Sequence, residues 1–253
     1  MIRFLYVLLL AGLFASFNGK AESISRKHVL KGVEQRVVVV TNGWDSSEGK
    51  LMCFSREGRK SWRPKFKESI PVMLGSKGIA WGRGVFIEAG RKIKKEGDGC
   101  APAGIFKIGK IYGESESLPV KSKYPYHRIT KLDAWIDDPK NPFYNRHVKI
   151  GPHEKEPVWF QSQRMRLGDP AYKWLIEIRH NSDPLKPGYG SAIFFHVQRG
   201  PDRKTAGCTA MKLIDLERLI SFLREDKTPH YVLLPYSEYK RKIKILNLPD
   251  FSY

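Results

Sequence analysis

The stretch from Gly190 to Met211, GSAIFFHVQRGPDRKTAGCTAM, decides how the fold is interpreted. Its apolar run from Ala192 to Phe195 is typical of a buried strand covered on both faces. Residues 200–204 interrupt that strand with a glycine, a proline and three charges, so we expect a loop there. Gly207 permits a tight turn that passes close to a ligand. We predict that an amphipathic helix begins at Met211.

The same stretch holds a histidine and a cysteine that a strand, a loop and a turn can bring face to face. His196 and Cys208 are the pair. A cysteine attacks as its thiolate, and a neighbouring imidazole supplies the base. Backbone N–H groups of Gly207 and Cys208 would then stabilise an oxyanion. A structural cysteine beside a satisfied core histidine is the alternative. Small neighbours favour catalysis because they leave room beside the sulfur: Thr205, Ala206, Thr209 and Ala210.

The segments GSAIFFH, beginning at Gly190, and TAGCTAM, beginning at Thr205, resemble the catalytic signature of the L,D-transpeptidases. These cysteine enzymes cross-link peptidoglycan stem peptides, and the resemblance is to the branch that carries Ala-Gly-Cys. It extends over roughly residues 37–235. It implies a mainly β, sandwich-like domain with few helices, one of them after Cys208. Ala206 and Ala210 replace polar residues that are common in the wider family, so the roles of those groups are not carried over.

Two other segments carry the resemblance. Residues 94–106, KKEGDGCAPAGIF, form a charged turn that leads into a strand near the cleft, and we expect an internal ion pair among Lys95, Glu96 and Asp98. Residues 133–146, DAWIDDPKNPFYNR, would shape the cleft, with Trp135 as an aromatic wall. The paired acids of this segment do not match a calcium-binding EF-hand loop. Acyl transfer through a cysteine does not need a carboxylate pair, so we assign them no catalytic role.

The expected substrate-binding residues surround the histidine and the cysteine. They are Ser191, Tyr189, Arg199, Thr205, Ala206, Thr209 and Trp135. His127 and His147 are expected to be loop residues, because their spacing assembles no zinc-ligand cluster. We therefore predict neither a metal nor a cofactor.

By resemblance, the Cys208 thiolate attacks the bond between the diamino acid and the terminal D-Ala of a tetrapeptide stem. D-Ala leaves, a thioester remains, and a side-chain amine resolves it, which cross-links the third residues of two stems. An L,D-carboxypeptidase, in which water resolves the same thioester, is a close alternative. A non-catalytic wall-binding protein that tolerates Cys208→Ala is a second one. A papain-like protease does not fit, because its C-G-x-C-W signature is absent.

The N-terminus has the pattern of an export signal. A short positive start precedes an apolar run from Phe4 to Phe17, and Gly19 and Ala21 have cleavage spacing. We predict a signal peptide at residues 1–21, a catalytic domain at 22–235 and a basic extension at 236–253. An uncleaved membrane anchor is the alternative. Cleavage would leave no stable membrane span and place the protein in the periplasm or cell envelope.

Composition bears on partners and on the redox state. The formal charge is +19, from 45 Lys and Arg against 26 Asp and Glu. Nucleic acid is a poor partner for an exported chain whose basic residues are spread throughout, so we favour anionic envelope polymers besides stem peptides. A generic solvated basic surface is equally consistent. If Cys208 is the nucleophile, Cys53 and Cys100 either form a disulfide or remain separate buried thiols.

The remaining apolar runs outline the rest of the domain. A hairpin with a long loop is expected from Val37–Val40 and Lys50–Phe54. The alternation from Trp174 to His180 predicts a strand, and Tyr231–Pro235 predicts the closing one. Leucines and isoleucines at helical spacing between residues 213 and 223 predict a core-facing helix.

Overall fold

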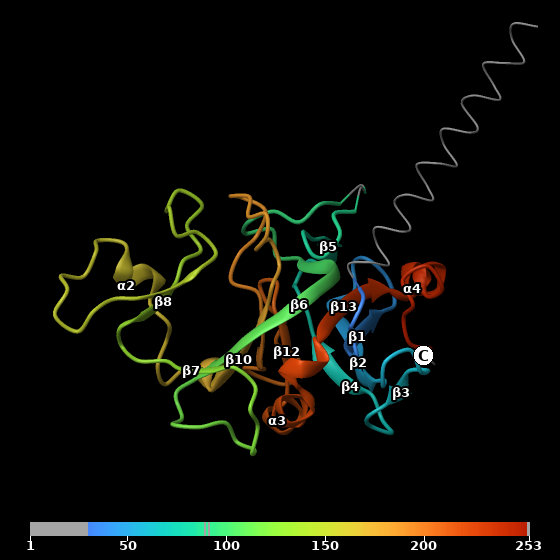
Figure 1. The fold of residues 1–253 in the computed structure, drawn as a ribbon. Coiled ribbons are helices and arrows are strands. Elements are labelled where there is room, and N and C mark those ends of the chain that lie inside the picture. The colour runs from blue at the N-terminus through green and yellow to red at the C-terminus, as the bar shows by residue number, and fades with distance from the viewer. Residues whose placement is uncertain (1–29, 89, 91, 252–253) are drawn as a thin grey trace, which may run out of the picture.

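The computed structural model describes residues 30–88, 90 and 92–251, and strands dominate it (Figure 1). The main sheet has eleven strands. They are β1 (Gln35–Thr41), β2 (Glu48–Ser55), β3 (Arg63–Pro64), β4 (Ile70–Met73), β5 (Ile79–Trp81), β6 (Ala101–Gly113), β7 (Tyr126–Arg128), β10 (Trp174–Ile178), β11 (Phe194–Val197), β12 (Thr209–Met211) and β13 (His230–Pro235). A second sheet pairs β8 (Asp133–Trp135) with β9 (His147–Lys149). Helices are few in the described part: α2 (Phe160–Gln163), α3 (Leu213–Phe222), α4 (Tyr236–Lys242) and the 3-10 turns η1 (Pro170–Tyr172) and η2 (Glu225–Lys227). The predicted mainly β, sandwich-like fold with few helices is confirmed.

The main sheet closes on itself. Its strands run in the order β1-β13-β6-β10-β11-β12-β4-β2, and β2 also pairs with β1. The β-branched run Val37–Val40 is fully buried in β1, between parallel β13 and antiparallel β2. This confirms the predicted hairpin of β1 and β2. The closing strand β13 is also confirmed, and the apolar faces of these strands enclose the main core.

The helix after the cysteine begins later than predicted. Met211 pairs with Val197 and ends strand β12, and α3 starts at Leu213. The expectation that Met211 opens the helix is therefore wrong, because its backbone is used in the sheet. The core-facing character of α3 is confirmed: Leu216, Leu219 and Ile220 are fully buried in the main core.

The C-terminal segment packs on the same core as the sheet. Tyr236–Lys242 forms α4, and Tyr239 is fully buried with its hydroxyl donating to the Pro249 carbonyl at 2.7 Å. Leu248 and Phe251 belong to the main hydrophobic core. The segment that was expected to extend beyond a domain ending at residue 235 therefore contributes to that core.

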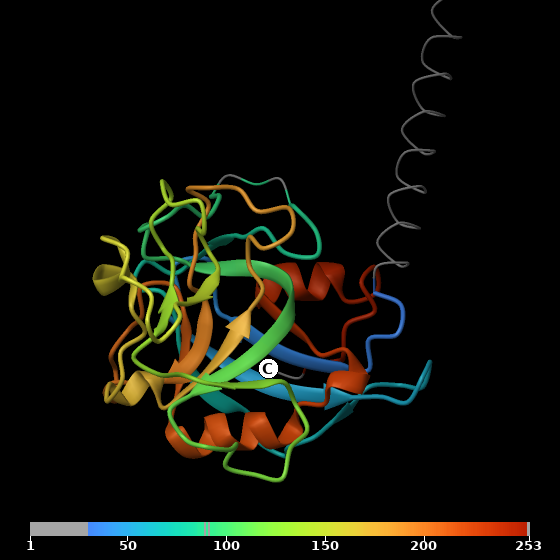
Figure 2. The same cartoon turned by 60° about the vertical axis from the view of Figure 1, so that its left-hand side comes forward.

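A separate lobe covers the outer face of β6, β10 and β11. It contains β8, β9 and α2, on the left of Figure 1, and has its own small core of Ala134, Ile136, Ile150 and Phe160. A third apolar cluster, which includes Tyr112, Leu175 and Phe194, joins this lobe to the sheet. Figure 2 shows the long green strand β6 arching across the molecule beside this junction.

Three sequence predictions concern export and cysteines. The predicted signal, residues 1–21, lies outside the described residues. No helix in the described part of the chain has the length and apolarity needed to cross a membrane. Cys53 and Cys100 are free, buried thiols, so the separate-thiol alternative holds in this structure.

Candidate functional site

Strand pairing places His196 and Cys208 on one face of the sheet. Parallel strands β11 and β12 pair Phe195 with Thr209 and His196 with Ala210. Because side chains alternate along a strand, Phe194, His196 and Cys208 share the face opposite to that of Phe195 and Thr209. His196 and Cys208 line one pocket of about 160 Å³.

Cys208 is half-buried, and two backbone groups contact its sulfur. The N–H of Phe194 donates to Sγ at 3.4 Å, and the thiol donates to the Ala192 carbonyl at 3.4 Å. Burial raises the pKa of Cys208, against the opposing effects of the Phe194 N–H and the charges of Lys94 and Arg199. The resting group is therefore the thiol.

The His196 ring is oriented by its own backbone. Its Nδ1 lies 2.8 Å from the Val197 carbonyl, which can only accept, so Nδ1 carries the proton and Nε2 retains its lone pair. Burial lowers the pKa of His196, partly offset by the Val197 carbonyl. Both pKa shifts favour neutral groups, so the resting pair is a thiol and an imidazole. No hydrogen bond joins Sγ to the ring among the residues that the structure describes.

The turn before the cysteine is held by Thr205. Its Oγ1 donates to the Cys208 carbonyl at 2.7 Å and accepts from the Gly207 N–H at 3.0 Å. This occupies the Gly207 N–H, which was predicted as an oxyanion donor. The N–H of Cys208 has no hydrogen-bond partner within the described ranges, so it is the donor of the two that remains available.

Two predicted substrate contacts line the pocket. Trp135 in β8 packs edge-on against Phe194, with ring centroids 4.7 Å apart. Arg199 lies at the pocket and forms a two-pronged ion pair with Asp169, Nη2 to Oδ2 at 2.5 Å and Nε to Oδ1 at 3.2 Å. Asp169 also accepts from the Ala171 N–H at 3.0 Å and so starts η1, which carries Tyr172 to the pocket.

The other predicted contacts lie elsewhere. Thr209 is a correction: it is 1% exposed on the opposite face and hydrogen-bonds the Tyr231 hydroxyl at 2.9 Å. Tyr189 packs under the cations of Arg83 and Lys186 and does not line the pocket. The remaining three residues also lie outside the lining. They are Ser191, which donates to Glu96 at 2.8 Å, the turn residue Thr205, and exposed Ala206.

Residues 133–146, one of the two further segments that resemble the family, support the chain that leads into the strand of His196. Asn145 accepts from the Ala192 N–H at 3.0 Å and donates to the carbonyls of His180 and Asn181. It thereby fixes the chain where Ala192 offers its carbonyl to the thiol. The other segment does contain an internal ion pair, but its cation is Lys94 and not Lys95: Lys94 Nζ lies 2.5 Å from Asp98 Oδ1.

Sequence reasoning missed much of the pocket lining. Arg164 and Arg166 join Arg199 there; Asp169 already pairs with Arg199, and Asp137 is the carboxylate among the lining residues, so a smaller excess of positive charge remains. The Asp169-Pro170 pair, a helix N-cap followed by proline at the first position, was the one available signal for η1. The arginines precede it without a recognisable pattern.

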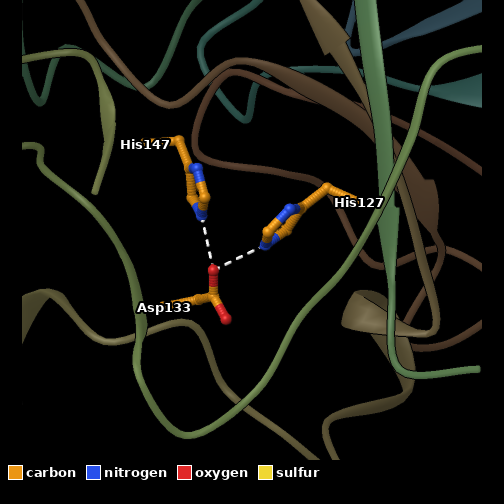
Figure 3. A group of neighbouring side chains, drawn as sticks. All are labelled: His127, Asp133 and His147. Atoms are coloured by element: carbon orange, nitrogen blue, oxygen red, sulfur yellow. Dashed lines mark hydrogen bonds and ion pairs between the residues drawn. The ribbon is translucent and has the colours of Figure 1, made fainter. Parts of the chain in front are cut away.

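A second group of polar side chains brings together one residue of the main sheet and two of the two-stranded sheet (Figure 3). His127 in β7 and His147 in β9 each place Nε2 2.7 Å from Oδ1 of Asp133. The expectation that the two histidines are loop residues is wrong, because both lie in strands that pairing brings together. Hydrogen bonds from Thr130 and both histidines lower the pKa of Asp133, although its burial opposes this.

Cross-strand pairing relates this group to the pocket. One row of partners runs across four strands: His127, Tyr112, Leu175 and His196. Three strand spacings of about 4.8 Å separate the ends of that row by about 14 Å. The group is therefore near the pocket and distinct from it.

Comparison with known proteins supplies the family. No curated protein and no solved structure matches the chain significantly. The family model for the L,D-transpeptidase catalytic domain matches residues 44–232, which include every residue of the pocket. The chain therefore belongs to the L,D-transpeptidase catalytic domain family.

Proposed function

We propose that this protein is an exported L,D-transpeptidase that cross-links the third residues of peptidoglycan stems through a Cys208 thioester. Members of its family act on peptidoglycan stem peptides. The observation that carries the proposal is one pocket lined by both a thiol and an imidazole whose Nε2 is unprotonated. Cys208 also keeps an unpartnered backbone N–H among the described residues.

In the first half-reaction, Cys208 Sγ attacks the carbonyl carbon of the bond before the terminal D-Ala. His196 Nε2 takes the thiol proton, and the Cys208 N–H stabilises the oxyanion. The tetrahedral intermediate collapses, the carbon–nitrogen bond breaks, and the imidazolium gives its proton to the D-Ala amine. The general base need not touch the thiol in the free enzyme, since such contacts often tighten only with substrate bound.

In the second half-reaction, a side-chain amine of another stem attacks the thioester. His196 removes a proton from that amine, the carbon–sulfur bond breaks, and the thiolate regains a proton. The arginines at the pocket suit the carboxylates of stem peptides.

Purified sacculi incubated with the enzyme and analysed by mass spectrometry test this proposal. We expect tetrapeptides to disappear and dimers linked through third residues to form, with neither change for Cys208→Ala. Tripeptides without new dimers would instead establish the L,D-carboxypeptidase alternative. A carbapenem adduct on Cys208 is also expected, and its absence together with unchanged sacculi would favour a non-catalytic wall-binding protein.

Export and a second partner class are parts of the same proposal. The signal-like residues 1–21 support cleavage and residence in the periplasm or envelope. The +19 charge supports attraction to anionic envelope polymers. Cell fractionation with N-terminal sequencing of the mature chain tests cleavage, and recovery of the uncleaved chain in membranes would contradict it.

A further inference from the structure

We propose that His127, Asp133 and His147 bind a divalent transition metal ion of the zinc class, at a site separate from the Cys208 pocket. The donor set carries the proposal. One atom from each residue, the two Nε2 atoms and Oδ1, lies within 4.8 Å of the others. Two imidazoles and one carboxylate are ligands that zinc prefers, and three protein ligands leave a fourth position for water.

The surroundings fix these donors. Oδ2 of Asp133 accepts from Thr130 N–H at 2.8 Å and Oγ1 at 2.7 Å, which turns Oδ1 toward the imidazoles. The ring of Tyr112 packs against both histidines, with centroids 5.7 Å from His127 and 5.2 Å from His147. Such supporting contacts orient metal ligands and are part of a built site.

Exposure suits an ion that enters from solvent. The Asp133 side chain is fully buried, whereas those of His127 and His147 are 26% and 20% exposed. The carboxylate is thus anchored in the protein, and the imidazole edges form the open side. Water can reach the fourth position there.

Metal binding requires a rearrangement of the three donor atoms. Each Nε2 now donates to Oδ1 over 2.7 Å. Metal–ligand bonds of about 2.0–2.1 Å in a tetrahedron separate neighbouring ligand atoms by about 3.3 Å. Each Nε2 therefore moves away from Oδ1 by roughly half an ångström. The two Nε2 atoms, which lie within 4.8 Å of each other, settle at about 3.3 Å. Each neutral imidazole keeps its proton on Nδ1 instead of Nε2.

The position of the site indicates what a bound ion would stabilise. His127 belongs to the main sheet, whereas Asp133 and His147 belong to the two-stranded sheet of the lobe. Trp135 pairs directly with His147 and shares its face, and it lines the Cys208 pocket. A metal ion would therefore clamp the lobe to the main sheet and hold the aromatic wall of the pocket in place.

The test uses the full chain carrying Cys208→Ala, so that the pocket thiol cannot bind the metal. Zn²⁺ is titrated in competition with a chromophoric chelator, and Co²⁺ is added in parallel as a spectroscopic probe. We expect one equivalent of Zn²⁺, and visible absorption of four-coordinate Co²⁺ without a thiolate charge-transfer band. His127→Gln and His147→Gln, each in the Cys208→Ala background, should weaken Zn²⁺ affinity more than about 100-fold. That loss exceeds the one expected when a residue only orients a metal ligand. Thr130→Val should weaken it roughly 10–100-fold.

His153→Gln is the matched control, because this exposed histidine lies outside the cluster and its loss should leave affinity unchanged. Circular dichroism of each variant confirms folding, which the two histidine substitutions should preserve because both side chains are partly exposed. The proposal fails if the Cys208→Ala chain binds no equivalent of Zn²⁺, which would make the cluster a hydrogen-bonded group only. It also fails if both histidine variants bind as tightly as their parent. Because the readout is binding in an inactive background, neither result depends on the proposed transpeptidase activity.

Discussion

The hydroxyl of Thr205 donates a 2.7 Å hydrogen bond to the carbonyl of Cys208, and its oxygen accepts from Gly207 N–H at 3.0 Å. One side chain thus closes the turn on both sides of the sulfur-bearing residue. The N–H of Cys208 is left unpartnered among the described residues. The arrangement converts a flexible Gly-Cys dipeptide into a fixed presentation of thiol and oxyanion donor.

Replacing Thr205 with valine should slow acylation of Cys208. The change keeps the shape of the side chain but removes both hydrogen bonds, each worth roughly 1 kcal/mol, and leaves their partners unsatisfied. We expect the rate of carbapenem adduct formation, followed by intact-protein mass spectrometry, to fall about tenfold or more. Thr205→Ser retains the hydroxyl and should react close to the native rate. Equal rates for the valine and native proteins would show that the turn is held by other contacts.

Gly207→Ala should destabilise the fold. Gly207 has a φ of +149°, and a Cβ there would lie 2.9 Å from the Cys100 carbonyl oxygen, closer than a carbon tolerates. We expect the free energy of unfolding from urea titration to fall by about 1–3 kcal/mol. The control is Gly43→Ala, where a Cβ meets nothing within 4 Å, with an expected change below about 0.5 kcal/mol. Similar losses for both variants would contradict the close approach to Cys100.

Alkylation of the resting enzyme should report the protonated thiol. Burial raises the pKa of Cys208, so the reactive thiolate is scarce at neutral pH and becomes populated only above the range of an ordinary cysteine. Iodoacetamide labelling, with the Cys208 peptide quantified by mass spectrometry, should therefore accelerate mainly at alkaline pH. A short cysteine peptide in the same tube is the reference and should label at lower pH. Rapid labelling of Cys208 near pH 6 would indicate a thiolate–imidazolium pair instead.

The decline of the carbapenem acylation rate at low pH should depend on protonation of His196. Burial lowers the pKa of His196 from its ordinary value of 6.5, so the imidazole stays neutral, and able to accept the thiol proton, to a lower pH. As pH falls, the carbapenem acylation rate should remain high through 6.5 and decline only below it. His196→Gln cannot accept that proton and should acylate slowly at every pH. A decline centred above pH 6.5 would mean that another group limits the reaction.

Local patterns in the sequence were sufficient for the elements that form from local propensity and burial. The valine run of β1 and the leucine spacing of α3 lie in the predicted elements. Of the predicted strand from Ala192 to Phe195, only the last two residues belong to β11, because Ala192 takes a positive φ of 52° and the strand begins at Phe194. That Asp98 forms an ion pair within its own turn was also accessible, although its partner is Lys94, four positions earlier, and not the predicted Lys95. The family signature of GSAIFFH and TAGCTAM indicated the cysteine and histidine, which lie only twelve positions apart.

Residue patterns could not reveal what depends on register between distant strands. The pairing of β11 with β12 turns Thr209 away from the pocket and retains Met211 in the sheet. The clustering of His127, Asp133 and His147 requires two different sheets to meet. Arg164 reaches the pocket through its bridge to Ala134 in the lobe, and Tyr172 through the packing of η1 on β10 and β11. The sequence alone therefore determined the β character and indicated His196 and Cys208 as the proposed reactive pair, because both inferences rest on neighbouring residues. Only the tertiary structure decided which side chains share a sheet face with His196 and Cys208. A shift of one residue in strand pairing would move each side chain to the other side of the sheet.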